Sequence, residues 1–281
     1  MNFYDRPECI TLSDYIDDYG TKSGIFVFKN FIPESLLEKL EASVNSKEEA
    51  PKEVEQNLID WYADKTVTDI DGTFELWELI SELLYPTWVI HPQVSALRIT
   101  PEHEGMYVHA DSPGKDQCHR LFQTDTWRTC CLLDYGAVAY FGNFEGGAIH
   151  YPNLNSDGTP HKDNESGDGK GFEYSPKRGD LVIHSAFYPY EHGVRPISSG
   201  MRYAFSTFSL KAADNPGTFY NYKSKEYLKQ VGERTPSELA DWVRPLYENP
   251  QFTSDKIKEY KASGLKGNEL AEHFFADMVE N

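Results

Sequence analysis

Apolar side chains recur every three or four residues in two stretches of the N-terminal part of the chain. One stretch follows Pro33, a residue that favours the first turn of a helix, and the other covers residues 74–84. The stripes are formed by Leu36, Leu37, Leu40 and Val44, and by Leu76, Ile80, Leu83 and Leu84. This spacing predicts two amphipathic helices.

From about residue 87 to residue 210 the pattern changes to short apolar runs separated by clusters of Gly, Pro, Asp and Asn. The runs cover residues 88–100, 105–110, 127–134, 136–142, 146–151, 180–185 and 200–210, and a similar one (GIFVF) covers residues 24–28. Several short strands at such spacing predict a β-sandwich or barrel. The polar segment 153–171 is predicted to be a loop that is either a lid or simply mobile.

The C-terminal part returns to helical spacing after Thr235-Pro236-Ser237-Glu238, a capping box with proline at the first helical position. No internal repeat or change of composition marks a domain boundary. The 281 residues are therefore predicted to form one domain. It would consist of a mixed N-terminal support (1–86), a β core (87–210) and a helical C-terminal extension (211–281).

Composition narrows the function classes. The hydrophobic share of 39% is enough for a sizeable core, whereas the formal net charge of -18 argues against binding to nucleic-acid backbones or anionic lipid. The four cysteines, Cys9, Cys118, Cys130 and Cys131, form no C-x-x-C pair, which favours a reduced compartment. No signal segment and no apolar run of about 18 residues is present, so we expect a cytoplasmic protein.

His109 and Asp111 lie two residues apart at the end of a strand-like run, GMYVHAD. Side chains two apart on a strand share a face, so both could bind one ion. With one distant histidine they would form a facial 2-His-1-carboxylate site, which suits non-haem Fe(II). H-x-D alone is weak evidence, and a second copy, His161-Lys162-Asp163, lies in the polar loop, where we attribute it to chance.

Two histidines compete for the third ligand position. His184 lies inside a predicted strand (LVIH), where a core histidine with its own partners is the more frequent case. His192 precedes Gly193, where the backbone can approach closely, and this favours His192 as the ligand. His150 is assigned to the face of another strand.

Arg202 follows His192 by ten residues and begins the last predicted strand. Its guanidinium could hold an anionic co-substrate by a bidentate, charge-assisted pair. Arg195 is the alternative, but it directly follows a turn and is expected to face solvent.

Three segments together resemble the Fe(II)/2-oxoglutarate-dependent dioxygenases, specifically their prolyl 4-hydroxylase-like branch. The segments are GMYVHADSP, FEGGAIHYPN and PKRGDLVIHSAFYPYEHGVRPISSGMRYAFSTF. They contain H-x-D, a glycine pair at the start of a strand, G-D-L before H-G-V, and G-x-R-Y, in this order over residues 105–208. The combination is far more specific than any single motif.

The resemblance implies a double-stranded β-helix (jelly roll) with flanking helices and the site at its open end. It assigns Fe(II) to His109, Asp111 and His192, and the distal carboxylate of 2-oxoglutarate to Arg202. Tyr140 is the nearest match to an assisting tyrosine of the family. Other subgroups place a serine two residues after the arginine; here Ala204 holds that position, and Ser206 on the same face is the alternative.

The activity implied by the resemblance is hydroxylation of an unactivated C–H bond by O2, coupled to conversion of 2-oxoglutarate to succinate and carbon dioxide, with ascorbate as a candidate reductant. A carboxylate at position 111, where related halogenases leave room for chloride, implies hydroxylation. A prolyl residue, a free amino acid and another small metabolite all remain open as substrates, as does the oligomeric state. Segments 153–171 and 115–127 are the expected covers of the site.

Two other function classes fit the sequence less well. A catalytically silent β-helix module used for binding would have lost a ligand or the arginine, and both are present. A divalent-metal hydrolase would leave the spacing of Arg202 to His192 unexplained.

Overall fold

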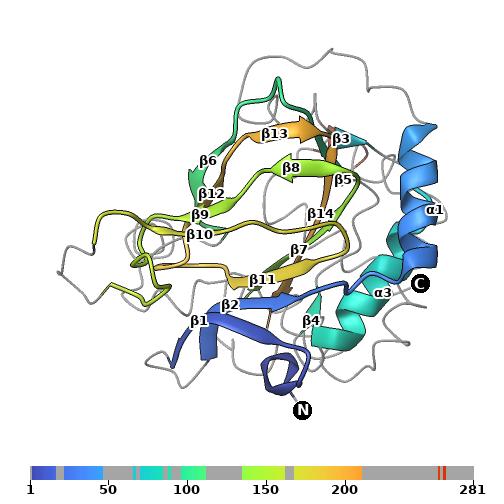
Figure 1. The fold of residues 1–281 in the computed structure, drawn as a ribbon. Coiled ribbons are helices and arrows are strands. Elements are labelled where there is room, and N and C mark those ends of the chain that lie inside the picture. The colour runs from blue at the N-terminus through green and yellow to red at the C-terminus, as the bar shows by residue number, and fades with distance from the viewer. Residues whose placement is uncertain are drawn as a thin grey trace.

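Antiparallel strands dominate the part of the chain that the computed structural model describes (Figure 1). The described residues are 2–16, 22–46, 66–67, 70–84, 88–89, 96–111, 135–161, 168–210, 259 and 262–263. A short 3-10 helix, Phe3–Asp5, precedes the first strand.

The larger sheet has the strand order β1-β2-β11-β7-β14-β5-β3, and β4 also pairs with β14. Its strands are β1 (Ile10–Ile16), β2 (Lys22–Phe28), β3 (Thr66–Val67), β4 (Trp88–Val89), β5 (Ala96–Ile99), β7 (Tyr135–Phe141), β11 (Leu181–Ser185) and β14 (Arg202–Leu210). The smaller sheet has the order β10-β9-β12-β6. Its strands are β6 (Met106–His109), β9 (Ile149–Tyr151), β10 (Phe172–Tyr174) and β12 (His192–Val194). A separate pair joins β8 (Phe144–Gly146) to β13 (Ile197–Gly200).

The chain passes repeatedly from one sheet to the other, and this defines the topology. Strands β5, β7, β11 and β14 lie side by side in the larger sheet in the order 5-14-7-11, while β6, β9, β10 and β12 form the smaller sheet in the order 6-12-9-10. Two interleaved sets of four antiparallel strands form a jelly roll. The predicted fold class, mainly β with flanking helices, is confirmed.

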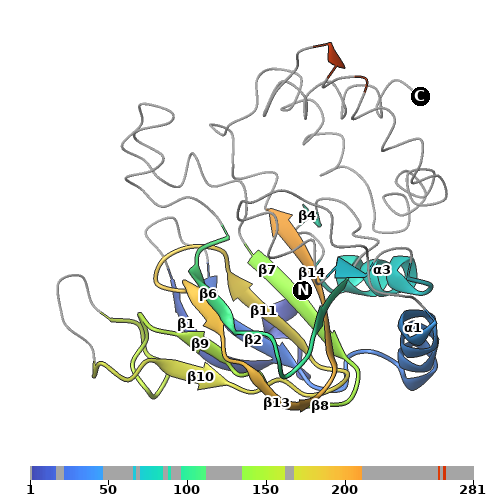
Figure 2. The same ribbon diagram turned by 90° about the horizontal axis from the view of Figure 1, so that it is seen from above.

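The larger sheet is buried on both faces, and alternate residues of β7 show this. Ala137, Ala139 and Phe141 belong to a core shared with helices α1 (Glu34–Asn45) and α3 (Thr73–Leu84). Tyr140 and Val138 face a second core, to which the smaller sheet contributes Ile149 and Tyr151. In both views α1 and α3 lie together, on the opposite side of the larger sheet from β6, β9 and β10 (Figures 1 and 2). The helices thus support the sheet from behind and leave its other face to the site.

Both N-terminal helices and the strands at residues 24–28, 105–110, 136–142, 180–185 and 200–210 are confirmed to within a few residues. The pattern missed β1, β3, β8, β10, β12 and β13, five of which have only two to four residues. Residues 127–134, the capping box, Cys118, Cys130 and Cys131 lie outside the described residues, and the division into three parts stays a prediction. Among the helices described, none has the length and apolar character to cross a membrane.

Candidate metal centre and anion pocket

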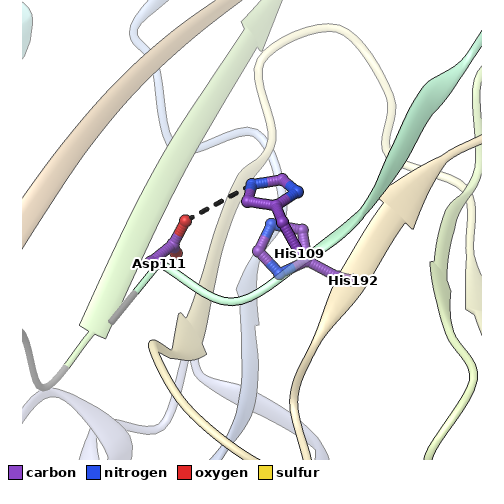
Figure 3. Close-up of side chains that lie close together, drawn as sticks. All are labelled: His109, Asp111 and His192. Carbon is purple, nitrogen blue, oxygen red and sulfur yellow. Dashed lines mark ion pairs between the residues drawn. The ribbon is translucent and has the colours of Figure 1, made fainter. Parts of the chain in front are cut away.

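His109 and His192 are brought together by the pairing of two strands. His109 is the last residue of β6, and it lies directly opposite His192, the first residue of β12, in antiparallel register. The two ring centroids are 4.6 Å apart. Asp111 follows two residues after His109 and turns its carboxylate toward the same space (Figure 3). One ligand atom from each of the three side chains lies within 4.8 Å of the other two.

Backbone carbonyls orient both imidazoles in the same way. Nδ1 of His109 lies 3.1 Å from the carbonyl oxygen of Tyr107, and Nδ1 of His192 lies 3.2 Å from that of Tyr190. A carbonyl oxygen can only accept a hydrogen bond, so Nδ1 of each ring carries the proton. Each Nε2 is then left with its lone pair, and this is the tautomer in which histidine binds a metal.

Burial and charge favour the protonation states that a metal needs. Loss of water around His192 lowers its pKa to about 3, and the neighbouring His184 and His109 act in the same direction against the opposing effect of Asp111. Burial alone would raise the pKa of Asp111, but the hydrogen bond from His184 and the three nearby imidazoles outweigh it and lower the pKa. A neutral imidazole beside an ionised carboxylate is ready to bind a cation without first losing protons.

The three side chains line a cavity of about 400 Å³ between the two sheets. Its wall also includes Leu97, Ile99, Val138, Ile149, Ala204 and Phe208. A mostly apolar cavity of this size with a few convergent polar groups is typical of a small-molecule site.

Arg202 lines the same cavity at a distance from the three ligands. The guanidinium carbon of Arg202 lies 5.8 Å from the centre of the Tyr140 ring, whereas Asp111 lies against Gly136. Tyr140 and Gly136 are four residues apart on β7, or roughly 13 Å along the strand. The cavity therefore has a histidine–aspartate end and an arginine end.

The Arg202 guanidinium is buried with an unused hydrogen-bond donor. The residue is 5% exposed, and Nη1 donates to the carbonyl oxygen of Gly147 at 2.9 Å. Its Nε is buried without a hydrogen-bond partner, and no carboxylate of the described residues pairs with it. Burial lowers its pKa. A buried cation with a free N–H predicts that an anion binds here.

The glycine pair of the sequence makes room for this arginine. Gly147 has a φ of +70°, and a Cβ there would collide with Nη1 of Arg202 and lie 2.8 Å from a methyl carbon of Ile197. The second glycine of the pair is thus required in this chain because a larger residue would collide with Arg202.

The other predicted site residues, Tyr140, Ala204 and Ser206, line the same cavity as the arginine. Tyr140 is buried in the cavity wall, and burial raises its pKa to about 12, so its hydroxyl keeps its proton. Ala204 pairs with Tyr140 across the sheet, and Ser206 lines the cavity two residues further along β14. Both alternatives for a second anion contact, Tyr140 and Ser206, therefore remain in reach of the cavity.

The residues that were not predicted to be ligands, Arg195 and His150, lie outside the three-ligand group. Arg195 is exposed, as predicted, and its Nε donates to Glu173 at 2.8 Å, although Arg195 also lines part of the cavity. His150 lies on β9 with its Nδ1 3.3 Å from Glu173. The segment 115–127 is not among the described residues. None of the described residues of loop 153–171 lines the cavity, so its role as a cover stays a prediction.

His184 is the residue whose place the sequence did not reveal. It was expected to be a core histidine with partners of its own, and it is buried and hydrogen-bonded, but one partner is the candidate ligand Asp111. Alternation along β11 was the available signal, because it places His184 on the same inward face as Val182.

No protein-family model matches the chain, and no curated protein matches it in sequence. Among solved structures, it is similar to a prolyl hydroxylase from Trichoplax adhaerens in complex with a hypoxia-inducible-factor peptide fragment, with 15% identity and a TM-score of 0.45 over 69% of this chain and 86% of that one. It is also similar to a viral collagen prolyl hydroxylase from Paramecium Bursaria Chlorella virus-1, with 13% identity and a TM-score of 0.44 over 66% and 88% of the two chains. At this low identity and overlap, the residues of the cavity rather than these likenesses indicate what the chain does.

Proposed function

We propose that this chain is an Fe(II)- and 2-oxoglutarate-dependent dioxygenase that hydroxylates an unactivated C–H bond. The observation that carries the proposal is the coincidence, in one cavity, of three convergent metal donors and a buried guanidinium without an anionic partner among the described residues. Either feature alone would fit several functions, and together they fit a metal that works with an anionic co-substrate.

His109 and His192 would hold Fe(II) through Nε2, and Asp111 through one carboxylate oxygen. Two imidazoles and one carboxylate are a donor set that suits Fe(II), and three protein ligands leave the remaining coordination positions for exogenous molecules. Their protonation states fit this role without rearrangement, since both rings are held with Nδ1 protonated and the pKa of Asp111 is lowered.

Arg202 would bind the distal carboxylate of 2-oxoglutarate, because its free Nε and remaining N–H groups can form a charge-assisted pair with it. Tyr140 and Ser206 are the candidate second donors to that carboxylate.

Bound Fe(II) would supply activation of O2 coupled to conversion of 2-oxoglutarate to succinate and carbon dioxide. The protein's own contribution is to place the co-substrate and the target C–H bond and to exclude water. The apolar wall, with Leu97, Ile99 and Ile149, would serve that purpose. A prolyl residue of a peptide and an amino-acid-like metabolite are the substrate classes that we propose.

Anaerobic titration of the metal-free protein with Fe(II) and then 2-oxoglutarate tests the proposal. We expect a weak visible charge-transfer band that needs both additions, and succinate release once oxygen is admitted. A silent binding module would release no succinate, and a metal hydrolase would show no dependence on 2-oxoglutarate. Candidate substrates can then be screened for enhanced succinate release and for a product heavier by one oxygen atom.

A further inference from the structure

His184 is a third buried histidine beside the candidate metal centre, and the proposed function does not use it. It lies on β11, in the opposite sheet from the strands that carry His109 and His192. Its ring centroid is 4.0 Å from that of His192, and its side chain is 2% exposed. It is nevertheless not one of the three residues whose ligand atoms converge.

The two oxygens of the Asp111 carboxylate face different histidines. Oδ1 lies 3.6 Å from Nε2 of His109, within the group of candidate ligands, whereas Oδ2 lies 3.2 Å from Nε2 of His184. An ionised carboxylate can only accept hydrogen bonds, so Nε2 of His184 carries the proton and donates it to Oδ2. One oxygen is therefore held away from the metal site, and the other is left to face it.

Tyr151 fixes the tautomer of His184 from behind. Its hydroxyl lies 3.1 Å from Nδ1 of His184, and both side chains are buried. With Nε2 of a neutral imidazole protonated, Nδ1 is an acceptor, so the tyrosine hydroxyl donates to it. The donors thus run in one direction, from Tyr151 to His184 to Asp111, and connect β9 and β11 to the segment that follows β6.

We propose, on the basis of the proposed function, that His184, oriented by Tyr151, is a positioning residue that holds the Asp111 carboxylate for binding through Oδ1 alone. Asp111 lies beyond the last residue of β6, so strand pairing does not fix it. Holding Oδ2 prevents the carboxylate from chelating the ion with both oxygens, and this keeps coordination positions open for the co-substrate and oxygen. Supporting hydrogen bonds of this kind set the orientation and basicity of metal ligands.

The space around this hydrogen bond is closely filled, as expected of a built feature. Gly136 on β7 lies opposite His184 in register. A Cβ at position 136 would collide with Oδ2 of Asp111 and lie 2.8 Å from Nε2 of His184. Only glycine leaves room for both groups here.

Titration of the metal-free full chain with Co(II), monitored by its visible spectrum, tests the inference. His184→Phe keeps a ring of similar size but removes the donor, and we expect it to weaken Co(II) binding by about 10–100-fold and to alter the spectrum. His184→Gln offers an amide N–H in place of Nε2 and is expected to recover most of the affinity. Tyr151→Phe removes a single oxygen and is expected to show a smaller loss.

His150→Phe is the matched control, because it changes a strand histidine of the same jelly roll that contacts Glu173 rather than the candidate ligands. Its Co(II) affinity should equal that of the wild type. Folded His184→Phe protein with wild-type affinity, or His184→Gln protein no better than His184→Phe, would overturn the inference. Should His184→Phe not fold, unchanged Co(II) binding by Tyr151→Phe would overturn it. A wild-type chain that binds no Co(II) would instead overturn the proposed function, and the inference with it.

Discussion

The two ends of the cavity treat their polar groups in opposite ways. At the histidine–aspartate end, the Nδ1 atoms of His109 and His192 and the Oδ2 atom of Asp111 have hydrogen-bond partners within the protein. At the arginine end, Nε of Arg202 is buried without a partner among the described residues. Both ends lie under the same sheets, so burial alone does not explain the difference.

The difference shows which end is complete and which one needs a ligand. Orienting groups at the histidine–aspartate end leave free only the atoms that would touch a metal. A buried guanidinium without an anion is a cost to the ligand-free protein, which a bound carboxylate would offset. Substitutions of the polar groups at the two ends should therefore differ in the sign, as well as the size, of their effect on the stability of the ligand-free protein.

The largest expected effect is that of Asp111→Ala. It removes a candidate ligand and leaves Nε2 of His184 without its acceptor, so metal affinity should fall by more than about 100-fold, since even supporting residues of a metal site contribute about 10–100-fold. Oxygen-dependent succinate release should fall to background. Asp5→Ala, at an exposed aspartate that accepts a hydrogen bond from Asn2 and lies outside the cavity lining, is the control and should leave metal affinity and succinate release unchanged. Full succinate release by Asp111→Ala would show that the ligand assignment is wrong.

Arg202→Met should separate the two ends. Loss of a buried charge partner costs about 2–5 kcal/mol, so the affinity for 2-oxoglutarate should fall roughly 30- to 4,000-fold while Co(II) affinity is retained. The ligand-free variant should unfold at the same temperature as the wild type or higher, because an unpaired buried cation has been removed. Arg195→Met changes the exposed arginine that also lines the cavity, and it should retain 2-oxoglutarate affinity; a strong loss there instead would move the anion site to Arg195.

A pair of glycine substitutions tests each end sterically. Gly136→Ala crowds Asp111 and His184, and Gly147→Ala crowds Arg202. Each should destabilise the fold by about 1–3 kcal/mol, measured by denaturant unfolding. The first should weaken chiefly metal binding and the second chiefly 2-oxoglutarate binding. Equal effects of both variants on both ligands would mean that the cavity responds as one unit.

The smallest expected effect is a pH dependence of stability in the metal-free protein. Burial lowers the pKa of folded His192 to about 3, whereas an unfolded histidine titrates near 6.5. As pH falls below about 6.5, the unfolded chain takes up a proton that the folded chain refuses, so stability is lost, by up to about 1.4 kcal/mol per pH unit. The lowered pKa of Asp111 causes a further loss of stability only in more acidic solution, below about pH 4.

Unfolding free energies measured with a chelator present between pH 7 and 5 check this slope. His192→Gln should reduce it, and Arg202→Met should leave it intact, because a guanidinium stays charged throughout that range. An unchanged slope in His192→Gln would assign the pH dependence to other groups.

Local rules predicted much of the arrangement. A strand period of two predicted His109 and Asp111 on one side, and the two side chains do line one cavity, although Asp111 lies beyond the end of β6. Alternation along β14 places Arg202, Ala204 and Ser206 toward the same cavity. The helices followed from their apolar stripes. The meeting of His192 with these residues was expected from the glycine that follows it and from the resemblance, and no strand pattern could predict it, since β12 has only three residues.

The contact of His184 with Asp111 could not be predicted in this way. The two residues are 73 positions apart, and they meet because strands of opposite sheets face each other. The alternation of β11 gave the direction of the His184 side chain but not its partner. Alternation therefore sets the face, whereas the partner depends on how the sheets pack.

The register that pairs His109 with His192 has a consequence for folding. Strand β6 ends the order of the smaller sheet, and among the described strands it pairs with β12 alone. A slip of one residue would turn His109 to the opposite side. An ion bound by both rings would link this terminal strand to β12. Hydrogen exchange at the amides of β6 should therefore slow when metal is added.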